Sequence, residues 1–522
     1  MSSLRSSLSR ATASPLLPPI LFAVFPVVFF WAQNVRGAFQ VRTVLAVLGI
    51  IFVGTFCVYG IVRLLTRSPK KAGLVTTAIL VLFFSFGHVA FRLEVGPNTL
   101  EETGLLVAWL FLGSAVVMVA LSRGNAASPT FFRTVSLVAG ALIVFNVVTI
   151  VRDSPTPVPV TAIVPFETDG WLASGSERDV YYLVFDRYAN EHTFAEQYGF
   201  DNLPFLSALE DDGFYVVHDA LANYPQTTHS LASTLNMTHL QDLAAEVGTD
   251  STDARPLYRS LKGFAVAQAF KDLGYRYAHI GTWWPQTAND PMADVDYTFG
   301  TYGEFSHVFA QTTMLPSLAS RVGIDRYDFR HQEWERHDYE FDSLREVASE
   351  PATTFTFAHF TFPHPPYVRD RNGNFVPSPD ERPIDQAYVE QVQAVNGMIL
   401  DLVNELLAGP QAQDPIVIIQ SDEGPYPAEV EAKGLHIELP KEPDEVLHRK
   451  LRILNAYYFP GMDPQDAGLY PEVTPVNTFR ILFNAYFDAG LPLLEDTTYV
   501  FADDDHPFRF TEVTDRVRVT ST

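Results

Sequence analysis

Acidic and histidine residues follow three strand-like segments in the second half of the chain. Asp186 follows VYYLVF, His364 lies just after TTFTFAHFTF, and Asp422 follows PIVIIQS. Ligands of open α/β sheets bind outside the carboxyl ends of the strands, so we expect these side chains to converge at one edge of a sheet. The alternative for each residue taken singly is an ordinary loop or cap position.

A segment rich in hydroxyl groups lies between the first two of these positions. Residues 222–237, ANYPQTTHSLASTLNM, place Thr227 and Thr228 at the start of a predicted helix. A hydroxyl at this place can be an N-cap. It can also be a nucleophile that faces an anion held by the free N–H groups and the positive end of the helix dipole. The local sequence leaves both interpretations open.

The elements that must position these residues follow an α/β pattern. The predicted strands are apolar almost throughout, which is typical of parallel strands buried on both faces. They are residues 179–185, 275–280, 353–362, 415–421 and 451–459. Residues 385–408 carry apolar side chains at three- and four-residue spacing and predict an amphipathic helix. The pattern predicts an α/β domain with a mostly parallel central sheet.

The first 151 residues differ from the rest of the chain in charge. They contain eleven Lys and Arg against three acidic residues, whereas the remainder has 25 basic and 58 acidic residues and a net charge of −33. Five uncharged apolar runs are each close to the ~20 residues that cross a bilayer. They are 16–32, 44–62, 72–91, 104–121 and 134–151. The first run contains Pro18, Pro19 and Pro26, which predict a kink.

These features predict three parts: an all-α membrane domain over 1–151 with five spans, a proline-rich linker over 152–175, and a domain over 176–522. With five spans and the N-terminus inside, the inner loops hold eight basic residues and the outer ones four, which favours the large domain outside the membrane. An even number of spans would reverse that side. The acidic balance excludes a general nucleic-acid binder, and the single Cys57 excludes a disulfide framework.

Together the motifs resemble a known family. VYYLVFDRYA, NYPQTTHSLASTLNM, FAHFTFPHPPY, IIQSDEGP and RILNAYYFPG, spread over 178–495, are similar to the membrane-anchored sulfatase-like branch of the alkaline phosphatase superfamily. This branch includes lipoteichoic acid synthases and phosphoethanolamine transferases. The resemblance implies an alkaline phosphatase-like three-layer sandwich that hydrolyses or transfers a phosphate or sulfate ester outside the membrane, with one divalent metal ion.

The resemblance also implies roles for individual residues. Asp186 and Asp422 match acidic metal ligands, and Thr227 matches the nucleophile that also contacts the metal, with Thr228 as the alternative. A divalent ion neutralises the anionic ester and lowers the pKa of the hydroxyl, so that the threonine oxygen can form a covalent intermediate.

Three further residues match substrate-contacting positions. His364 matches a histidine that contacts the substrate or leaving group and could protonate or hydrogen-bond the leaving oxygen. Trp283 and Trp284, which follow the strand YRYAHI, fall where such enzymes contact substrate. Sulfatases proper typically use a modified Cys or Ser, so a threonine favours phosphoryl transfer. The implied partners are the lipid bilayer and an anionic ester that could be a lipid headgroup, a glycan or a polymer.

Glu423 departs from the family pattern, because relatives carry histidine where this chain reads Asp422-Glu423-Gly424. If Glu423 joins Asp186 and Asp422 as a ligand, three carboxylates surround one divalent cation and repel an anionic substrate. Such an all-oxygen shell favours Mn²⁺, Mg²⁺ or Ca²⁺ over Zn²⁺.

The sequence leaves three outcomes open for this departure. Glu423 turns away and His436 or His448 supplies the missing ligand, Glu423 ligates a hard cation, or catalysis is lost and the domain is a membrane-tethered binding or assembly module. The basic residues around His448, which include Lys450, could offset the extra charge.

Overall fold

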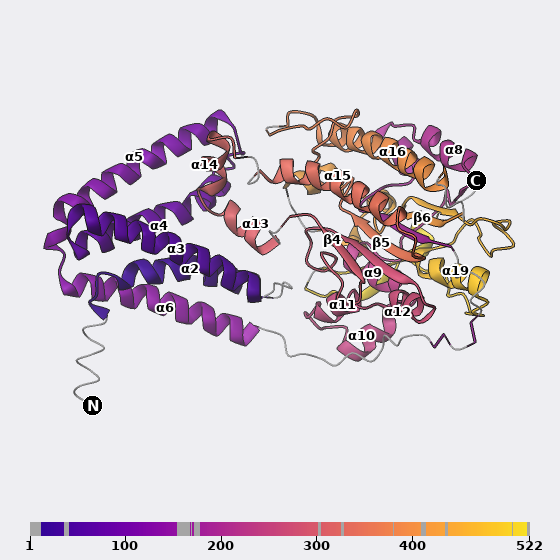
Figure 1. Cartoon of the computed structure of the whole chain (residues 1–522), viewed down its shortest axis with the longest axis horizontal. Coiled ribbons are helices and arrows are strands. Elements are labelled where there is room, and N and C mark those ends of the chain that lie inside the picture. The colour runs from indigo at the N-terminus through magenta and orange to yellow at the C-terminus, as the bar shows by residue number, and fades with distance from the viewer. Residues whose placement is uncertain are drawn as a thin grey trace. The chain divides into compact units, whose positions relative to one another are not determined.

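The computed structural model describes residues 12–35, 41–153, 167–168, 170–171, 178–300, 304–324, 328–378, 380–408, 414–433, 437–503 and 505–518. The chain forms two compact units (Figure 1). The first comprises Met1–Thr156 and Tyr302–Gln332, and the second Pro157–Thr301 and Glu333–Thr522. Most of the predicted linker, 152–175, lies outside the described residues.

Apolar helices make up most of the first unit. They are α2 (Leu17–Gln33), α3 (Val41–Thr66), α4 (Pro69–Arg92), α5 (Leu100–Arg123) and α6 (Pro129–Asp153). The last four are long and apolar enough to cross a membrane, whereas α2 has 17 residues with Pro26 in its interior. Thr99 caps α5 by accepting a hydrogen bond from the Glu102 amide at 3.0 Å. The predicted all-α membrane domain is confirmed.

Two short helices from a later part of the sequence belong to this unit. They are α13 (Glu304–Gln311) and α14 (Leu315–Arg321), which stand in the sequence between β4 and α15 of the other unit. Phe305 and Phe309 of α13 pack edge-on against Phe30 of α2. The Met314 amide donates to the Phe83 carbonyl of α4 at 2.9 Å. The sequence analysis assigned this segment to the 176–522 domain, but its aromatic face packs on the apolar helices.

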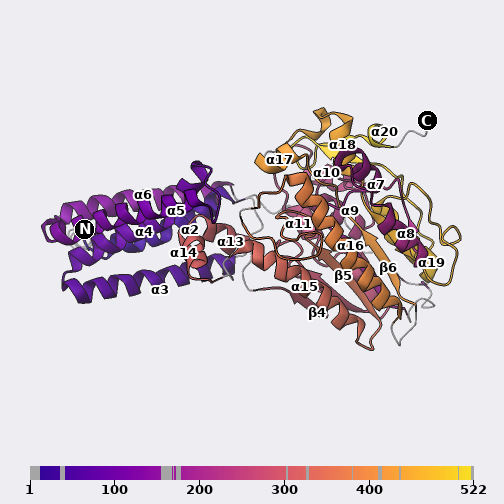
Figure 2. The ribbon, with the colours of Figure 1, turned by 90° about the horizontal axis from the view of Figure 1, so that it is seen from above.

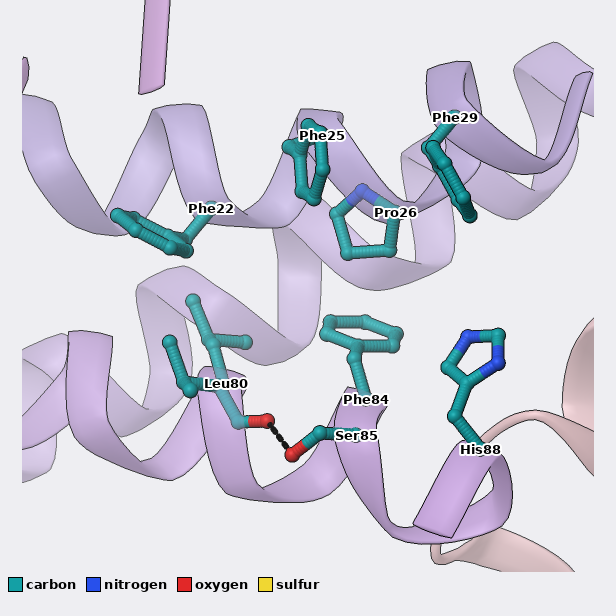
Figure 3. Close-up of a pocket in the computed structure, with 9 residues that line it drawn as sticks. Phe22, Phe25, Pro26, Phe29, Leu80, Phe84, Ser85 and His88 are labelled. Atoms are coloured by element: carbon teal, nitrogen blue, oxygen red, sulfur yellow. Dashed lines mark hydrogen bonds between the residues drawn. The ribbon is translucent and has the colours of Figure 1, made fainter. Parts of the chain in front are cut away.

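Helices α2 and α4 leave a cavity of about 370 Å³ between them (Figure 3). Phe22, Phe25, Pro26 and Phe29 of α2 face Leu80, Phe84 and His88 of α4. The Ser85 hydroxyl donates to the Val81 carbonyl within α4 at 2.5 Å, which leaves His88 as the main polar side chain of this wall.

A seven-stranded sheet forms the centre of the second unit, in the order β2-β7-β6-β1-β5-β3-β4. The strands are β1 (Val180–Phe185), β2 (Tyr215–Val216), β3 (Arg276–Gly281), β4 (Val295–Thr298), β5 (Thr354–Phe360), β6 (Ile416–Gln420) and β7 (Asn455–Tyr458). β6, β1, β5, β3 and β4 run parallel, and β7 pairs antiparallel with β6 and with β2. A separate hairpin joins β8 (Tyr499–Phe501) and β9 (Phe510–Glu512).

Helices cover both faces of this sheet (Figure 1). One face packs on α9 (Thr227–Leu235), α12 (Ala265–Asp272) and α19 (Thr478–Phe487). The other packs on α8 (Leu203–Asp211), α15 (Phe329–Ala348) and α16 (Ile384–Ala408), and Figure 2 shows α15 and α16 lying along the strands. Along β1, Val180, Tyr182 and Val184 enter the first layer and the alternate residues enter the second. The predicted three-layer sandwich with a mostly parallel sheet is confirmed.

Smaller helices connect these layers. They are α7 (Glu191–Thr193), α10 (Gln241–Val247), α11 (Arg255–Ser260), α17 (Ala428–Lys433), α18 (Asp444–Leu451) and α20 (Thr514–Val517). The last turn of α18 brings Lys450 to the carboxyl end of β6.

Candidate functional site

Three neighbouring strands of the sheet, β6, β1 and β5, end side by side. Val184 of β1 is paired with His359 of β5 and with Gln420 of β6. Asp186 is the first residue after β1, and Asp422 is the second residue after β6. Adjacent strands are ~4.8 Å apart, so side chains at matching positions on them must meet.

Asp186, His359 and Asp422 form a compact group there. One potential ligand atom of each lies within 4.8 Å of the others, and the three residues are 5%, 1% and 2% exposed. Asp186 Oδ1, Asp422 Oδ2 and His359 Nε2 have no hydrogen-bond partner among the described residues. Buried polar atoms without partners are costly, and three of them facing one point fit a divalent cation.

Burial and mutual repulsion dominate the electrostatics of the two carboxyl groups. Burial, followed by the charges of Asp422 and Glu423, raises the pKa of Asp186 well above its usual value. Burial and Glu423 likewise raise the pKa of Asp422 to about 7. Burial lowers the pKa of His359 to about 3, so its imidazole is neutral. A cation would favour the charged carboxylates and the neutral imidazole, which is the state that binds metal.

His359 is held in the ligand orientation by a chain of hydroxyl groups. Its Nδ1 lies 2.9 Å from Thr287 Oγ1, which lies 3.0 Å from Thr282 Oγ1. The Trp284 amide donates to Thr282 Oγ1 at 3.0 Å. When Nδ1–H donates to Thr287, the lone pair of Nε2 points to the two carboxylates. His359 was not predicted as a site residue, because TTFTFAHFTF is recognised only as the interior of a strand. The one indication in the sequence is that a histidine stands near the end of an otherwise apolar strand.

Thr227 is the first residue of α9, and its side chain is half-buried beside this group. Its hydroxyl interacts with the Asp422 carboxylate and lowers the pKa of that group, against the effect of burial. The N-cap residue, Gln226, makes no side-chain capping bond, so the first N–H groups of α9 point out of the helix end. Thr228, the alternative nucleophile, is buried within the helix.

Glu423 points to two cations rather than joining the three-residue group. Its Oε1 lies 2.8 Å from Lys450 Nζ and 3.1 Å from Arg187 Nε. The Lys450 side chain is fully buried, and Arg187 also pairs with Glu431. The charge of Glu423 is therefore compensated by protein cations. Only part of the first of the three outcomes is met, because the histidine in the group is His359 and not His448.

Gly424 makes this pairing possible. A Cβ atom at this position would lie 2.1 Å from the Arg449 carbonyl oxygen, a distance that no side chain tolerates. The close approach lets the Gly424 amide donate to the Lys450 carbonyl at 2.8 Å and Lys450 Nζ donate to the Gly424 carbonyl at 2.9 Å. Glycine thus brings the end of α18 against the loop after β6.

Of the two histidines considered for the missing ligand position, His448 is not in the group. His448 donates from Nε2 to the Arg516 carbonyl at 3.0 Å. His436 lies outside the described residues.

The predicted substrate-contacting residues lie around the same edge. His364 is half-buried, and its Nδ1 lies 2.5 Å from the Pro365 carbonyl oxygen. Burial and the charges of Arg187 and Lys450 hold the pKa of His364 well below its usual value. The Trp284 ring lies edge-on to His359 with centroids 6.5 Å apart, whereas Trp283 interacts with Glu333 of α15.

This arrangement can be compared with known proteins. Residues 178–464, more than half of the 522-residue chain, match the sequence model of the family described as Sulfatase. The chain belongs to the sulfatase family. This match confirms the sulfatase-like resemblance that the motifs indicated. A search of curated proteins finds no match.

Several solved structures are similar to this sulfatase-family chain. The C-terminal periplasmic domain of EcEptC from Escherichia coli in complex with Zn is 12% identical, with 67% of this chain and 96% of that chain covered and a TM-score of 0.43. The soluble domain of lipooligosaccharide phosphoethanolamine transferase A from Neisseria meningitidis is 15% identical, with 62% and 94% covered and a TM-score of 0.39. The integral membrane protein EptA from Neisseria meningitidis is 12% identical, with 90% and 96% covered and a TM-score of 0.37.

The charge balance of the group in this sulfatase-family protein favours metal binding. Two ionised carboxylates and one neutral imidazole would leave a bound divalent cation neutral overall, and Lys450 offsets Glu423. If Glu423 were a third carboxylate ligand, the group with its divalent cation would instead carry a net charge of −1. A set with an imidazole nitrogen accepts Zn²⁺ as well as Mn²⁺ or Mg²⁺, whereas the preference for hard cations rested on an all-oxygen shell.

Proposed function

We propose that this protein is a membrane-bound, metal-dependent transferase or hydrolase of phosphate esters, with Thr227 as the nucleophile. The observation that carries the proposal is the group of Asp186, His359 and Asp422, whose unpartnered ligand atoms converge beside the Thr227 hydroxyl at the start of α9. A divalent cation bound there would neutralise the ester and stabilise the charge that develops in the transition state.

Thr227 is suited to attack because of its two neighbours. Asp422 accepts the hydroxyl hydrogen and so turns a lone pair of the oxygen toward the ester. The N–H groups and dipole of α9 stabilise the anionic group being transferred. A bond forms between the threonine oxygen and phosphorus as the bond to the leaving oxygen breaks. A threonine nucleophile favours phosphate over sulfate, because sulfatases proper use a modified Cys or Ser.

His364 is proposed to act on the incoming water or alcohol. A neutral imidazole that donates Nδ1–H to the Pro365 carbonyl has its lone pair at Nε2 and can accept the proton of an incoming hydroxyl there. The same nitrogen, once protonated, returns the proton to a leaving oxygen. Trp284, beside His359, is proposed to contact the substrate, and Trp283 to support it through Glu333.

The alternative of a non-catalytic binding module rested on Glu423. The pairing of Glu423 with Lys450 and Arg187 places its charge outside the ligand group, so this residue no longer favours that alternative.

The nucleophile is tested with the full-length protein and an aryl phosphate, with the aryl sulfate alongside. Thr227→Ala should lower turnover of the phosphate by at least ~10³, equivalent to more than ~4 kcal/mol of transition-state stabilisation. Thr228→Ala is the matched control and should retain activity. A covalent phosphate adduct trapped by mass spectrometry should map to Thr227. Equal turnover in Thr227→Ala and the parent protein would refute the assignment.

The metal ligands are tested by binding rather than activity. His359→Ala should weaken the affinity for Zn²⁺ or Mn²⁺, measured by calorimetry on chelator-treated protein, by at least ~10-fold. His448→Ala removes a histidine bonded to a distant carbonyl and should leave the affinity unchanged. Equal effects of the two substitutions would exclude His359 as a ligand.

A further inference from the structure

A cavity of about 480 Å³, called the groove below, lies within the first unit and is lined by α3, α4 and the inserted helices α13 and α14. Its walls from α3 and α4 are almost entirely apolar. They are Val47, Ile50, Ile51, Gly54, Thr55, Val58, Ile79, Leu80, Phe83 and Phe84. The Thr55 hydroxyl donates to the Ile51 carbonyl at 2.7 Å, so it presents no free polar group to the cavity. Leu80 and Phe84 also line the cavity shown in Figure 3.

Most of the polar lining comes from the inserted segment, and Gln332 of α15 adds to it. Ser306, His307 and Gln311 belong to α13, and the His307 ring bonds to the Gln311 amide at 2.8 Å. The insert contacts α4 at Phe83 and Gly87, where a Cβ on Gly87 would lie 2.2 Å from the Gln311 carbonyl oxygen. The opposite end, formed by Val58 and Ile79, is apolar.

The length of the apolar part matches one leaflet of a bilayer. From Val47 to Val58 the helical rise gives about 16 Å. Half of the ~30 Å hydrocarbon core is ~15 Å. The cavity is therefore long enough for the hydrocarbon chain of a lipid in one leaflet.

The apolar walls of the cavity do not suit an extended peptide. Its backbone N–H and C=O groups would find no partners along the apolar walls, at several kcal/mol for each group. A hydrocarbon chain has no such groups and gains close packing against these side chains.

We propose that this groove binds one acyl chain of a bilayer lipid, with the polar part of the lipid beside Ser306, His307 and Gln311. The binding does not depend on the ester chemistry proposed above. The polar end is built by the segment between β4 and α15 of the α/β unit, so the same insertion that joins the two units also forms the lipid site.

Glycines on α3 provide a matched test. Gly54 lines the groove, whereas Gly49 on the same helix does not. A Cβ atom at either position meets nothing within 4 Å, so both sites accept a side chain. Gly54→Trp fills the groove and Gly49→Trp adds the same side chain elsewhere. Gly54→Leu is a smaller filling variant for use if the tryptophan prevents folding.

The probe is a phosphatidylglycerol with a diazirine at the end of one acyl chain, in vesicles that contain the full-length protein. Photolysis of the parent protein should label the part of α3 near Val58. Gly54→Trp should reduce that labelling by ~10-fold or more, because each ~1.4 kcal/mol of lost binding free energy lowers the affinity tenfold. Gly49→Trp should label like the parent. Equal labelling of all three proteins would show only bulk lipid contact and overturn the proposal. Cross-links between two copies at this groove would also overturn it.

Discussion

Lys450 sets the charge at the carboxyl end of β6. Its ammonium group is fully buried, 2.8 Å from Glu423 and 3.8 Å from the centre of the Tyr426 ring. Burial lowers the pKa of Lys450, while Glu423 raises it. A buried charge without its partner is far more costly than the pair, so each residue requires the other.

This dependence predicts the effect of removing either charge. Lys450→Met should destabilise the protein by up to ~3–5 kcal/mol, because buried Glu423 keeps only Arg187 as a cationic partner beside the carboxyl groups of Asp186 and Asp422. Glu423→His should not restore a relative's activity, since it removes the partner of Lys450. The Lys450→Met, Glu423→Gln double substitution should recover much of the lost free energy of unfolding. Denaturant titration of the parent, Lys450→Met, Glu423→Gln and the double variant gives the coupling, and additive effects would contradict the pairing. Lys441→Met, at an exposed site, should change nothing measurable.

For single residues, the sequence could predict the acidic residues of the site but not the histidine and lysine that lie beside them. Asp186, Asp422 and Thr227 follow strands or begin a helix, and their positions are recognisable from local pattern alone. His359 lies within an apolar strand, and Lys450 reaches Glu423 only because Gly424 lets two distant segments touch. Such contacts depend on tertiary packing that no local pattern contains.

At the scale of elements, each of the five predicted segments overlaps a strand, although 353–362 and 451–459 extend beyond β5 and β7, and the two edge strands were not predicted. Predicted segments 179–185, 275–280 and 415–421 fall within one residue at each end of β1, β3 and β6. The edge strands β2, with two residues, and β4, whose side chains alternate between half-buried and exposed, carry too weak an apolar pattern. The physical reason is that only central strands are buried on both faces.

One connection between elements should respond to pH. His218, just after β2, lies 2.5 Å from Glu191 of α7 through Nδ1 and 3.2 Å from Glu210 of α8 through Nε2. The hydrogen bond with Glu191 is the main reason that the pKa of His218 is raised to about 9. Because the pKa in the folded state exceeds the unfolded value of ~6.5, this stabilisation is complete below pH 6.5 and is lost as the pH rises through 9.

His218→Gln should therefore remove part of the pH dependence of unfolding between these two values. The free energy of unfolding of the parent protein should fall more steeply than that of the variant from pH 6.5 to 9, measured by denaturant titration at several pH values. Parallel curves would mean that the two contacts add nothing to stability.

At the scale of the whole molecule, the chain connects its two units more than once. The predicted linker is followed by a second crossing, because the segment with α13 and α14 returns to the membrane helices. Glu102, in the first turn of α5, accepts a hydrogen bond from Ser317 at 2.5 Å and pairs with Arg321 at 3.4 Å. A sequence reading that divides the chain at one linker cannot find this, since α13 and α14 are too short for a membrane-span pattern.

The side of the membrane on which the α/β unit lies can be predicted from α3 to α6 alone. The connection between α3 and α4 contains Arg67 and is flanked by Arg63 of α3 and by Lys70 and Lys71 of α4. The connection between α5 and α6 is flanked by Arg123 and Arg133. Both connections are therefore expected inside, which puts the chain after α6 outside. If the 17-residue α2 also crosses the membrane, only the side of the N-terminus changes. The side of the α/β unit therefore does not depend on whether the total number of spans is odd or even.

Fusion reporters can separate these two questions. An alkaline phosphatase reporter, active only outside, should be active after residue 518 and inactive when inserted between α5 and α6 at Ala127. A reporter before α2 should be inactive if α2 crosses and active if it does not, without any change at the other two positions. Activity at Ala127 together with inactivity after residue 518 would invert the topology. It would also remove an outside ester from the substrates that Thr227 can reach.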